Sequence, residues 1–323
     1  RTSIMPNYQG VWSLTTQMQN ASDWPAPIVP ARGLFFGGYN GSANTNRIQY
    51  IAIQTLGNTT DFGDLSRGMS SGAACSSSTR GVQGGGADAS GTQTNTIEYV
   101  TIASTGNATD FGDLNATTTQ NSGVSNNTRG LFSLSLEGGS SYTVNVDYVT
   151  IASTGNATDF GDKTTNFAYG MDNGVSSSTR AIYGGGYIST GVSNVIQYAT
   201  IASTGNFSDF GDLTAARYGV GGVCSATRGV FMGGANSNVM DYITIASTGN
   251  ATDFGDMADA GNVYGGGTSS NVRGVLGGGN TGSNTNRIAY ITIASTGNAQ
   301  DFGDLAEAAN YVSACSDGHG GLQ

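Results

Sequence analysis

The sequence predicts an all-β protein with the architecture of a seven-bladed β-propeller, and three repeated features lead to this prediction. The first is the motif Asp-Phe-Gly-Asp, which occurs six times at spacings of 44 to 50 residues. The second is a Tyr twelve residues before each motif Phe, and the third is an Arg that opens an apolar run usually ending in a Gly pair. The motif, the Tyr and the Arg recur in one fixed order, and such repetition is typical of a repeat protein whose units pack on their neighbours.

Each repeat predicts four short strands. In the second repeat they cover residues 73–76, 81–83, 97–104 and 108–114, with clusters of Gly, Asn and Ser between them. Such a unit predicts a propeller blade, because one small sheet buries both faces only when neighbouring sheets stack on it. Helical solenoids are excluded, since no segment repeats apolar residues with a period of 3.6.

The two ends of the chain predict how the ring closes. Residues 11–25 align without gaps on the third and fourth strands of the second repeat, with Trp12 in the place of Tyr99. The C-terminal residues align on the first and second strands, with Cys315 in the place of Cys75. The sequence therefore predicts six complete blades and a seventh built from both termini, two strands from each, which removes free sheet edges.

The predicted single propeller domain spans residues 1–323, and its blade boundaries follow from the repeated anchors. Blades one to six are expected at 26–65, 66–114, 115–163, 164–213, 214–257 and 258–305. The seventh blade is expected to combine residues 1–25 with residues 306–323.

The charge of the chain restricts its partners. The formal net charge is -10 with a pI near 4.3, and only 12 residues are Lys or Arg. A basic surface for nucleic acid is therefore not expected. Nothing approaches the run of about 18 apolar residues that crosses a bilayer, so membrane insertion is not expected either.

The repeated residues resemble the kelch repeat, in which an apolar strand ends in a Gly pair and is followed by a Tyr and then a Trp. Here the pair is Gly37-Gly38 in the first repeat, the Tyr is Tyr50, and Phe62 stands in the place of the Trp, which survives only at Trp24. The phrase Tyr-Ile-Thr-Ile-Ala-Ser-Thr-Gly-Asn-Ala-Thr-Asp-Phe-Gly-Asp also resembles kelch-like repeats in virion structural proteins of marine tailed bacteriophages. This resemblance implies a virion or extracellular location, on a tail, fibre or capsid surface, and other virion or assembly proteins as partners.

The repeated charged residues are interpreted as scaffold, because a group required in every blade is expected to serve blade packing. We expect each repeated Arg to donate charge-assisted hydrogen bonds to a motif Asp or to turn carbonyls. These residues are Arg32, Arg80, Arg129, Arg180, Arg228 and Arg273, with the motif carboxylates Asp61, Asp110, Asp159, Asp209, Asp253 and Asp301. The alternative is a ring of calcium sites, although the dense acidic run of a calcium loop is absent.

No catalytic, metal or cofactor site is predicted. Asp-Phe-Gly is also a kinase signature, but the strand Lys and catalytic-loop His-Arg-Asp that give it meaning are missing. His319 is the single His of the chain, which leaves zinc binding and a Ser-His-Asp arrangement poorly supported. The sequence therefore predicts a binding or structural module and not an enzyme.

Partner-binding residues are expected where the repeats differ, in the segment between the Gly pair and the Tyr strand. The candidates are Tyr39, Asn40, Arg47, Tyr142, Tyr187 and Arg287. Two functions remain open: a structural or protein-interaction module of a virion, and a propeller that binds carbohydrate or a host receptor. Convergence of loop aromatic side chains on one face would favour glycan binding, whereas a flat polar face buried against another chain would favour assembly.

Overall fold

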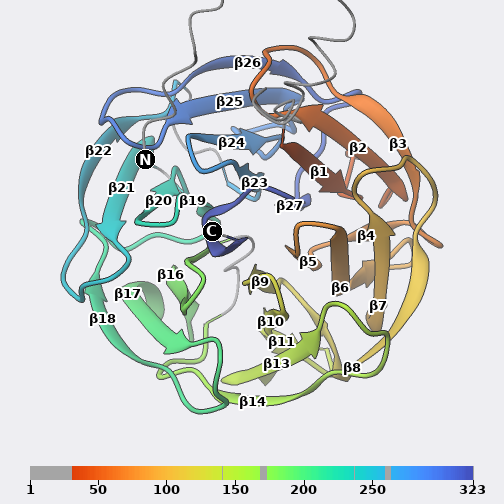
Figure 1. Ribbon diagram of the computed structural model, residues 1–323, viewed down its shortest axis with the longest axis horizontal. Helices are drawn as coiled ribbons and strands as arrows, with labels where there is room; N and C mark the ends of the chain where they lie inside the picture. The colour runs from red at the N-terminus through yellow and green to blue at the C-terminus, as the bar shows by residue number, and fades with distance from the viewer. Residues whose placement is uncertain (1–30, 140, 168–172, 236, 259–262, 323) are drawn as a thin grey trace, which may run out of the picture. The chain divides into compact units, whose positions relative to one another are not determined.

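A computed structural model describes residues 31–139, 141–167, 173–235, 237–258 and 263–322 of the chain. These residues form β-sheets around a central axis and a short C-terminal 3-10 helix, η2 (Gly320–Leu322) (Figure 1). The prediction of an all-β propeller with four-stranded blades is confirmed. Five sheets are four-stranded blades, and a further sheet has seven strands that include the same four-strand path.

In each sheet the first strand named below lies at the axis and the fourth at the outside of the ring (Figure 1). Sheet 1 contains β27 (Ser313–Ser316), β1 (Arg32–Phe36), β2 (Arg47–Ala52) and β3 (Thr60–Asp64). Sheet 2 contains β5 (Ala73–Ser76), β6 (Arg80–Asp88), β7 (Gln93–Thr101) and β8 (Thr109–Thr119), extended by β4 (Met69–Ser70), β11 (Leu136–Glu137) and β12 (Ser141–Tyr142). Sheet 3 contains β9 (Ser122–Ser125), β10 (Arg129–Ser133), β13 (Asn145–Thr150) and β14 (Thr158–Asp162).

The other three sheets follow the same plan with consecutive strands. Sheet 4 contains β15 (Gly174–Ser176), β16 (Arg180–Ile188), β17 (Gly191–Thr200) and β18 (Ser208–Asp212). Sheet 5 contains β19 (Gly221–Cys224), β20 (Arg228–Met232), β21 (Val239–Thr244) and β22 (Thr252–Asp256). Sheet 6 contains β23 (Gly266–Ser269), β24 (Arg273–Gly277), β25 (Arg287–Thr292) and β26 (Gln300–Asp304).

The predictions of seven blades and of a two-plus-two closure are wrong. Among the described residues the inner strands contact one another in a closed circle, β27, β5, β9, β15, β19 and β23, which leaves no place for another sheet. The predicted first blade, residues 26–65, supplies only three of its own strands. Its inner strand is β27 from the C-terminus, which pairs antiparallel with β1 so that Cys315 faces Leu34. The predicted N-terminal half-blade, residues 1–25, lies outside the described residues.

Each outer strand carries a β-bulge at the motif Phe. In sheet 2 the register runs from Ile97 opposite Gly112 to Glu98 opposite Asp110, so Phe111 is the extra residue. Its ring packs edge-on against Tyr99 with centroids 5.9 Å apart, and equivalent Tyr–Phe pairs recur in the other sheets. Gly112 has φ +147°, and a Cβ there would lie 2.5 Å from the carbonyl oxygen of Gly155 in sheet 3. The motif Gly therefore allows two sheets to approach closely.

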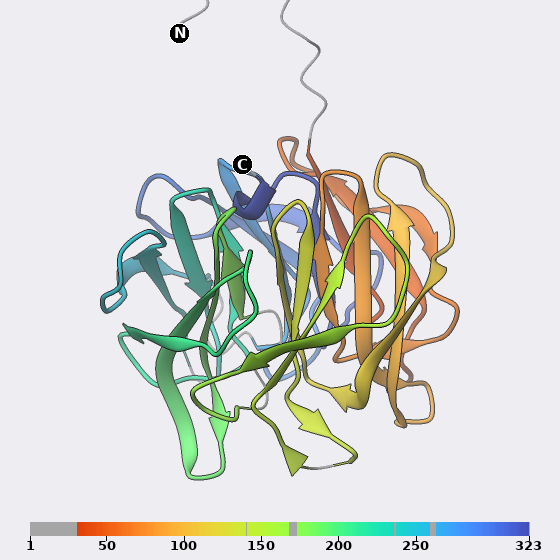
Figure 2. The same cartoon turned by 60° about the horizontal axis from the view of Figure 1, so that its bottom comes forward.

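The connections between strands alternate between the two ends of the ring, because neighbouring strands within a sheet are antiparallel. One end carries the loops between second and third strands and the segments that lead to the next sheet, and we call it the loop face. The other end carries the remaining turns, and we call it the turn face. Figure 2 shows η2, which follows β27, at this end of the ring.

Candidate functional site

The repeated Arg side chains join neighbouring sheets near the turn face. Arg80 stacks over the ring of Tyr99, 4.5 Å from its centroid, and its Nη1 donates to the carbonyl oxygen of Ile151 in sheet 3 at 3.0 Å. All six seams carry this arrangement, and Arg273 closes the ring by donating to Ile53 at 3.0 Å. The acceptors are carbonyl groups at the start of turns, so each Arg links a sheet to the next one.

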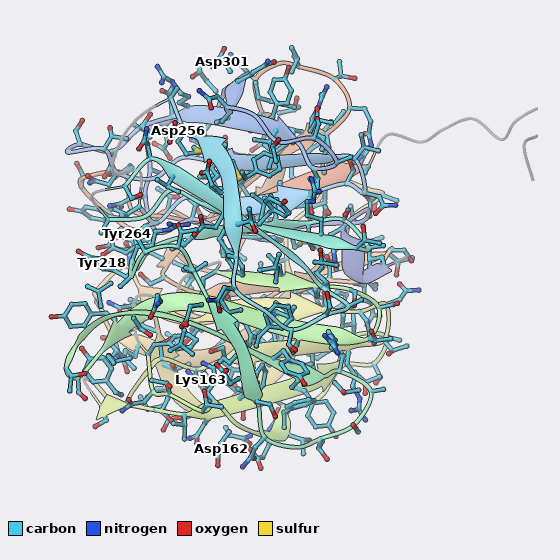
Figure 3. All side chains as sticks on the ribbon, turned by 90° about the vertical axis from the view of Figure 1, so that its left-hand side faces the viewer. Asp162, Lys163, Tyr218, Asp256, Tyr264 and Asp301 are labelled. Carbon is cyan, nitrogen blue, oxygen red and sulfur yellow. The ribbon has the colours of Figure 1, made fainter. Side chains whose placement is uncertain are left out.

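The motif carboxylates lie on the circumference of the ring. The first Asp of every motif is exposed on an outer strand, and Figure 3 shows motif residues Asp162 and Asp301 at opposite edges of the molecule. The second Asp acts through its backbone, because its N–H donates to an Asn side chain in the next sheet. Asp304 donates in this way to Oδ1 of Asn58 at 3.0 Å, and the bond recurs at the other five seams. Charges on these outer strands also oppose edge-to-edge pairing with other chains.

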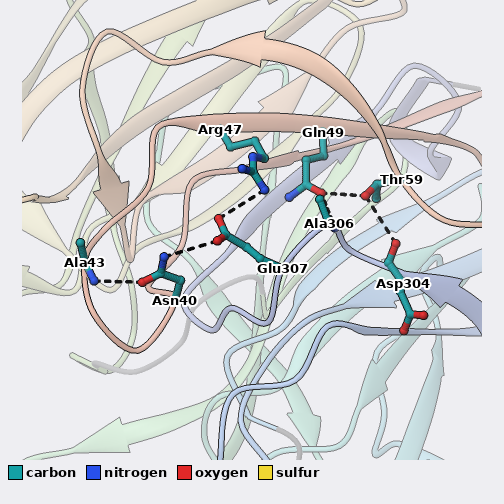
Figure 4. Close-up of polar contacts among 8 residues, drawn as sticks. All are labelled: Asn40, Ala43, Arg47, Gln49, Thr59, Asp304, Ala306 and Glu307. Atoms are coloured by element: carbon teal, nitrogen blue, oxygen red, sulfur yellow. Dashed lines mark hydrogen bonds and ion pairs between the residues drawn. The ribbon is translucent and has the colours of Figure 1, made fainter.

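A second set of polar contacts lies beneath the loop face. Oε1 of Gln49 accepts hydrogen bonds from the backbone N–H of Ala306 at 2.8 Å and from the hydroxyl of Thr59 at 2.7 Å (Figure 4). Glu98, Asp147, Gln197 and Asp241 accept equivalent bonds from the segment that leaves the preceding sheet. Ala289 stands at the sixth such position and has no polar side-chain atom.

The axis of the ring is a narrow channel that residues near the C-terminus close. The channel has a volume of roughly 40 Å³ and is lined by the inner strands and by His319. At its turn-face end, Ser hydroxyl groups donate hydrogen bonds to backbone carbonyls of the neighbouring inner strand. The hydroxyl of Ser76, for example, donates to the carbonyl of Ser316 at 2.7 Å. Cys224 takes the place of Ser in this series, and all three Cys are buried and form no disulfide. This end of the ring is therefore packed and offers little room for a ligand.

His319 is held in one neutral form. Its Nδ1 accepts a hydrogen bond from the backbone N–H of Gly321 at 3.1 Å. The hydroxyl of Ser125 donates to the carbonyl of Ser76, so it is left to accept from Nε2 of His319 at 3.3 Å. Burial lowers the pKa of His319 to about 4, because the charged imidazolium would lose its hydration. These contacts give His319 a structural role in holding the C-terminus.

Three of the predicted partner-binding residues lie together on the loop face. The Oδ1 of Asn40 accepts from the backbone N–H of Ala43 at 3.0 Å, and its Nδ2 donates to Glu307 at 3.4 Å. Arg47 forms an ion pair with the same carboxylate at 3.4 Å (Figure 4). The hydroxyl of Tyr39 donates to the carbonyl of Gly41 at 2.9 Å. Asn40 and Arg47 thus hold their loop against the segment that leads to β27.

The other three candidates lie elsewhere. Tyr142 is in β12, which pairs with β11 beyond the outer edge of sheet 2. Tyr187 is the next-to-last residue of the long strand β16 and packs edge-on against Tyr218, with ring centroids 5.8 Å apart. Arg287 begins β25 and is exposed. The structure therefore separates the predicted set into one cluster around Tyr39 and three positions on other sheets.

The structure reveals a line of four Tyr side chains, of which the sequence predicted only Tyr187. Tyr187, Tyr218, Tyr264 and Tyr311 are partly buried and follow one another across the loop face, with ring centroids 5.8, 6.2 and 4.5 Å apart. Figure 3 shows Tyr218 and Tyr264 side by side at one end of the molecule. The sequence did contain a signal, since a Tyr stands two or three residues before the inner strand in three consecutive repeats.

The backbone at the mouth of the channel is in an unusual conformation. Ser71, Gln120, Tyr264 and Tyr311 have φ values from 58° to 65° although none is Gly, and Gly219 at the equivalent position has φ 65°. Four hydrogen bonds of 2.8 to 3.1 Å link these residues in the order Gly219, Tyr264, Tyr311, Ser71 and Gln120, and in each bond the N–H of the later residue donates to the carbonyl of the one before it in this order. We call these five residues the collar. Left-handed conformations of non-Gly residues cost energy and gather at functional sites.

A hollow of roughly 470 Å³ opens beside the collar, over the seam between sheets 1 and 2. Three collar residues, Ser71, Gln120 and Tyr311, line it together with Tyr39. The rest of its wall consists of Ser42, Ala43, Asn44, Ser70, Ala87, Ala89, Ser90 and Gly91. Its volume lies in the range of about 300 to 1,000 Å³ that small-molecule sites occupy. The hollow is the best candidate for a binding site among the described residues.

Lys163 is a buried basic residue at the start of the segment that leaves sheet 3. Lys163 takes the position that Leu occupies in most repeats, with Nζ donating to the carbonyl of Leu134 and lying 4.5 Å from the centre of the Phe167 ring. Burial lowers the pKa of Lys163 to about 7. Within the described ranges, no three His, Cys, Asp or Glu side chains are placed to hold a metal ion.

Comparisons with known proteins do not assign the chain to a family. No protein-family model matches the chain, and a search of curated proteins finds no match. In the part of the chain that the structure describes, helical structure long and apolar enough to span a membrane was not found.

Proposed function

We propose that the chain is a non-enzymatic, virion-associated interaction module, in which a propeller presents its loop face to a partner. A propeller fold suggests a module for protein interactions, because its rigid ring supports loops that vary independently. The virion association is supported by the resemblance of the repeated phrase to kelch-like repeats of phage structural proteins. The partners proposed are therefore other proteins of the particle and a surface that the particle meets.

The observation that carries the proposal is that the repeated residues join the sheets, whereas the residues that vary between repeats gather on one face. The repeated Arg, Asn and Gly residues are occupied in joining sheets, as the bonds of Arg80 and Asn58 illustrate. The residues that differ between repeats, including Tyr39, Tyr264 and Tyr311, gather on the loop face instead. Aromatic side chains are enriched at binding surfaces because they bury a large area with few rotatable bonds.

The turn face is proposed as the side that contacts the assembly. Leu56 and Val272 are 53% and 65% exposed, and both lie in turns at this end of the ring. Their turns belong to the same seam, since Arg273, next to Val272, donates to the carbonyl of Ile53 near Leu56. A contact there would leave the loop face outward.

High-resolution imaging of the native particle or complex tests this proposal. The expected result is density for the propeller with its turn face against a capsid, tail or fibre protein and its loop face accessible. Recovery of the chain only as a solitary secreted protein would contradict the virion association, and burial of the loop face would contradict the proposed orientation.

The second candidate function is a propeller that binds carbohydrate or a host receptor. It is favoured by one specific observation, the convergence of Tyr187, Tyr218, Tyr264 and Tyr311 on the loop face. Aromatic faces accept the apolar faces of sugar rings as well as protein side chains.

A further inference from the structure

We infer that the hollow between Tyr39 and Tyr311 binds a neutral saccharide. This inference rests on the proposed use of the loop face for binding, and it names the site and the chemical class of its ligand. Three observations carry it: the lining of the hollow, the strain in its wall and the support behind its aromatic rings.

The lining contains no ionisable acid or base other than Tyr. It combines two Tyr side chains with the amides of Asn44 and Gln120 and several Ser hydroxyl groups. An anionic ligand such as a sialylated or sulfated glycan would require a cation in the wall, because a charge removed from water without a partner is costly. Amides and hydroxyls match the hydroxyl groups of an uncharged sugar, and a Tyr ring offers an apolar face to its C–H groups.

Part of the wall has a strained backbone. Among the described residues, four that are not Gly have a positive φ, and Ser71, Gln120 and Tyr311 line the hollow. The fourth, Tyr264, stacks on Tyr311 with centroids 4.5 Å apart and an interplanar angle of 31°. The conformation is maintained by the collar bonds, such as Ser71 N–H to the carbonyl of Tyr311 at 3.0 Å. Strain that recurs around one cavity points to a site shaped for a ligand.

The polar groups of the hollow are held in place before a ligand arrives. Nδ2 of Asn44 donates to the carbonyls of Ala87 at 3.1 Å and Asp88 at 2.7 Å, which fixes this amide across the seam between sheets 1 and 2. The backbone of Tyr39 pairs with that of Asn310, and its carbonyl accepts from Asn284 at 2.8 Å. The backbones of Tyr39 and Tyr311 are thus each held by hydrogen bonds through both N–H and C=O, so little backbone entropy remains to be lost on binding.

The test begins with the isolated full chain and an array of neutral, sialylated and sulfated glycans. The strongest neutral binder is then titrated by calorimetry against wild type, Tyr39→Ala and Tyr311→Gly. Gly suits the left-handed backbone of residue 311, so this variant removes the ring without adding strain. Val192→Ala is the matched control, because it trims an exposed apolar side chain beside the β16–β17 loop, on the same face but outside the hollow. Thermal melts check that each variant is folded.

The expected result is binding of neutral glycans, weakened at least tenfold in Tyr39→Ala and Tyr311→Gly and changed less than twofold in Val192→Ala. Binding of charged glycans alone, equal loss in all three variants, or no binding on the array would each overturn the inference. These outcomes are distinct from failure of the proposed function. A particle image with the loop face buried by protein would remove that function, whereas an empty array with an exposed loop face would remove only the saccharide.

Discussion

Arg217 and Asp241 form a buried ion pair between the segment that leaves sheet 4 and strand β21 of sheet 5. Their atoms Nη2 and Oδ2 are 2.9 Å apart, and the two side chains are 1% and 0% exposed. Asp241 also accepts hydrogen bonds from the backbone and the hydroxyl of Thr214. Met69 and Phe167 occupy the position of Arg217 in two other repeats, so the ion pair is particular to this seam.

Removing one partner of this pair is expected to cost more than removing both. Asp241→Ala should lower the free energy of unfolding by about 3 to 5 kcal/mol, because it leaves the Arg217 charge buried and the Thr214 donors unpaired. The double variant Arg217→Phe with Asp241→Gln should recover most of this loss, since it reproduces the residues Phe167 and Gln197 found at the seam between sheets 3 and 4. Urea denaturation measures both, and a double variant no more stable than Asp241→Ala would contradict the assignment.

Lys163→Leu is expected to stabilise the protein by about 1 to 3 kcal/mol at pH 7. Burial lowers the pKa of Lys163 to about 7 from 10.5, so the unfolded chain binds more protons between these pH values. The contribution of Lys163 to stability therefore rises from pH 7 to pH 10.5. The advantage of the Leu variant should shrink over this range, as measured by urea denaturation at pH 7 and pH 9.5. An advantage independent of pH would show that the pKa of Lys163 is not lowered.

The hydrogen bonds of His319 predict a loss of stability in mild acid. The pKa of His319 is lowered from 6.5 to about 4, so the unfolded state binds more protons between these values, and stability falls as the pH drops from 6.5 to 4. Since His319 is partly exposed, we expect an effect on the order of 1 kcal/mol. His319→Gln should be less stable at pH 7 but should show a smaller decrease between pH 7 and pH 4.5. Equal decreases in both proteins would contradict this role.

Arg80→Ala is expected to lower the free energy of unfolding by about 1 to 3 kcal/mol. The change removes the stacking on Tyr99 and leaves the carbonyl of Ile151 without the Arg80 donor. Arg80→Lys keeps a charge but loses the planar group, so it should lie between the wild type and the Ala variant. An unchanged thermal midpoint for Arg80→Ala would show that this link between sheets 2 and 3 contributes little.

Ala substitutions at two Gly residues with similar backbone conformations distinguish the cost of backbone strain from the cost of a steric clash. Gly112 and Gly155 have φ of +147° and +154°, but only a Cβ on Gly112 meets other atoms, 2.5 Å from the Gly155 oxygen. Gly112→Ala should therefore destabilise the protein by at least about 2 kcal/mol more than Gly155→Ala, because two sheets must move apart. Similar losses in urea denaturation of the two variants would indicate that the backbone conformation alone decides the cost.

Local repetition was enough to predict strands and blades, but the number of sheets depends on contacts between distant residues. The alignment of Cys315 with Cys75 correctly placed both in equivalent inner strands. It could not show that β27 would pair with β1, because register between the ends of a chain leaves no periodic mark in the sequence. The same holds for the hollow, whose residues Tyr39, Ser71 and Tyr311 come from three segments. Only Tyr39 among them was predicted, since its loop visibly differs between repeats.

The sequence by itself determined that this protein is all-β, that its repeats form four-stranded blades, and which residues recur in every repeat. Spacing and residue type decide these features, because strand alternation, Gly turns and the bulge at each motif Phe are local in the chain. The tertiary structure alone decided that β27 completes sheet 1, that the ring closes without a seventh blade, and that strained residues meet around one hollow. These features depend on how closely whole sheets approach one another, which is a property of the packed ring and not of any single repeat.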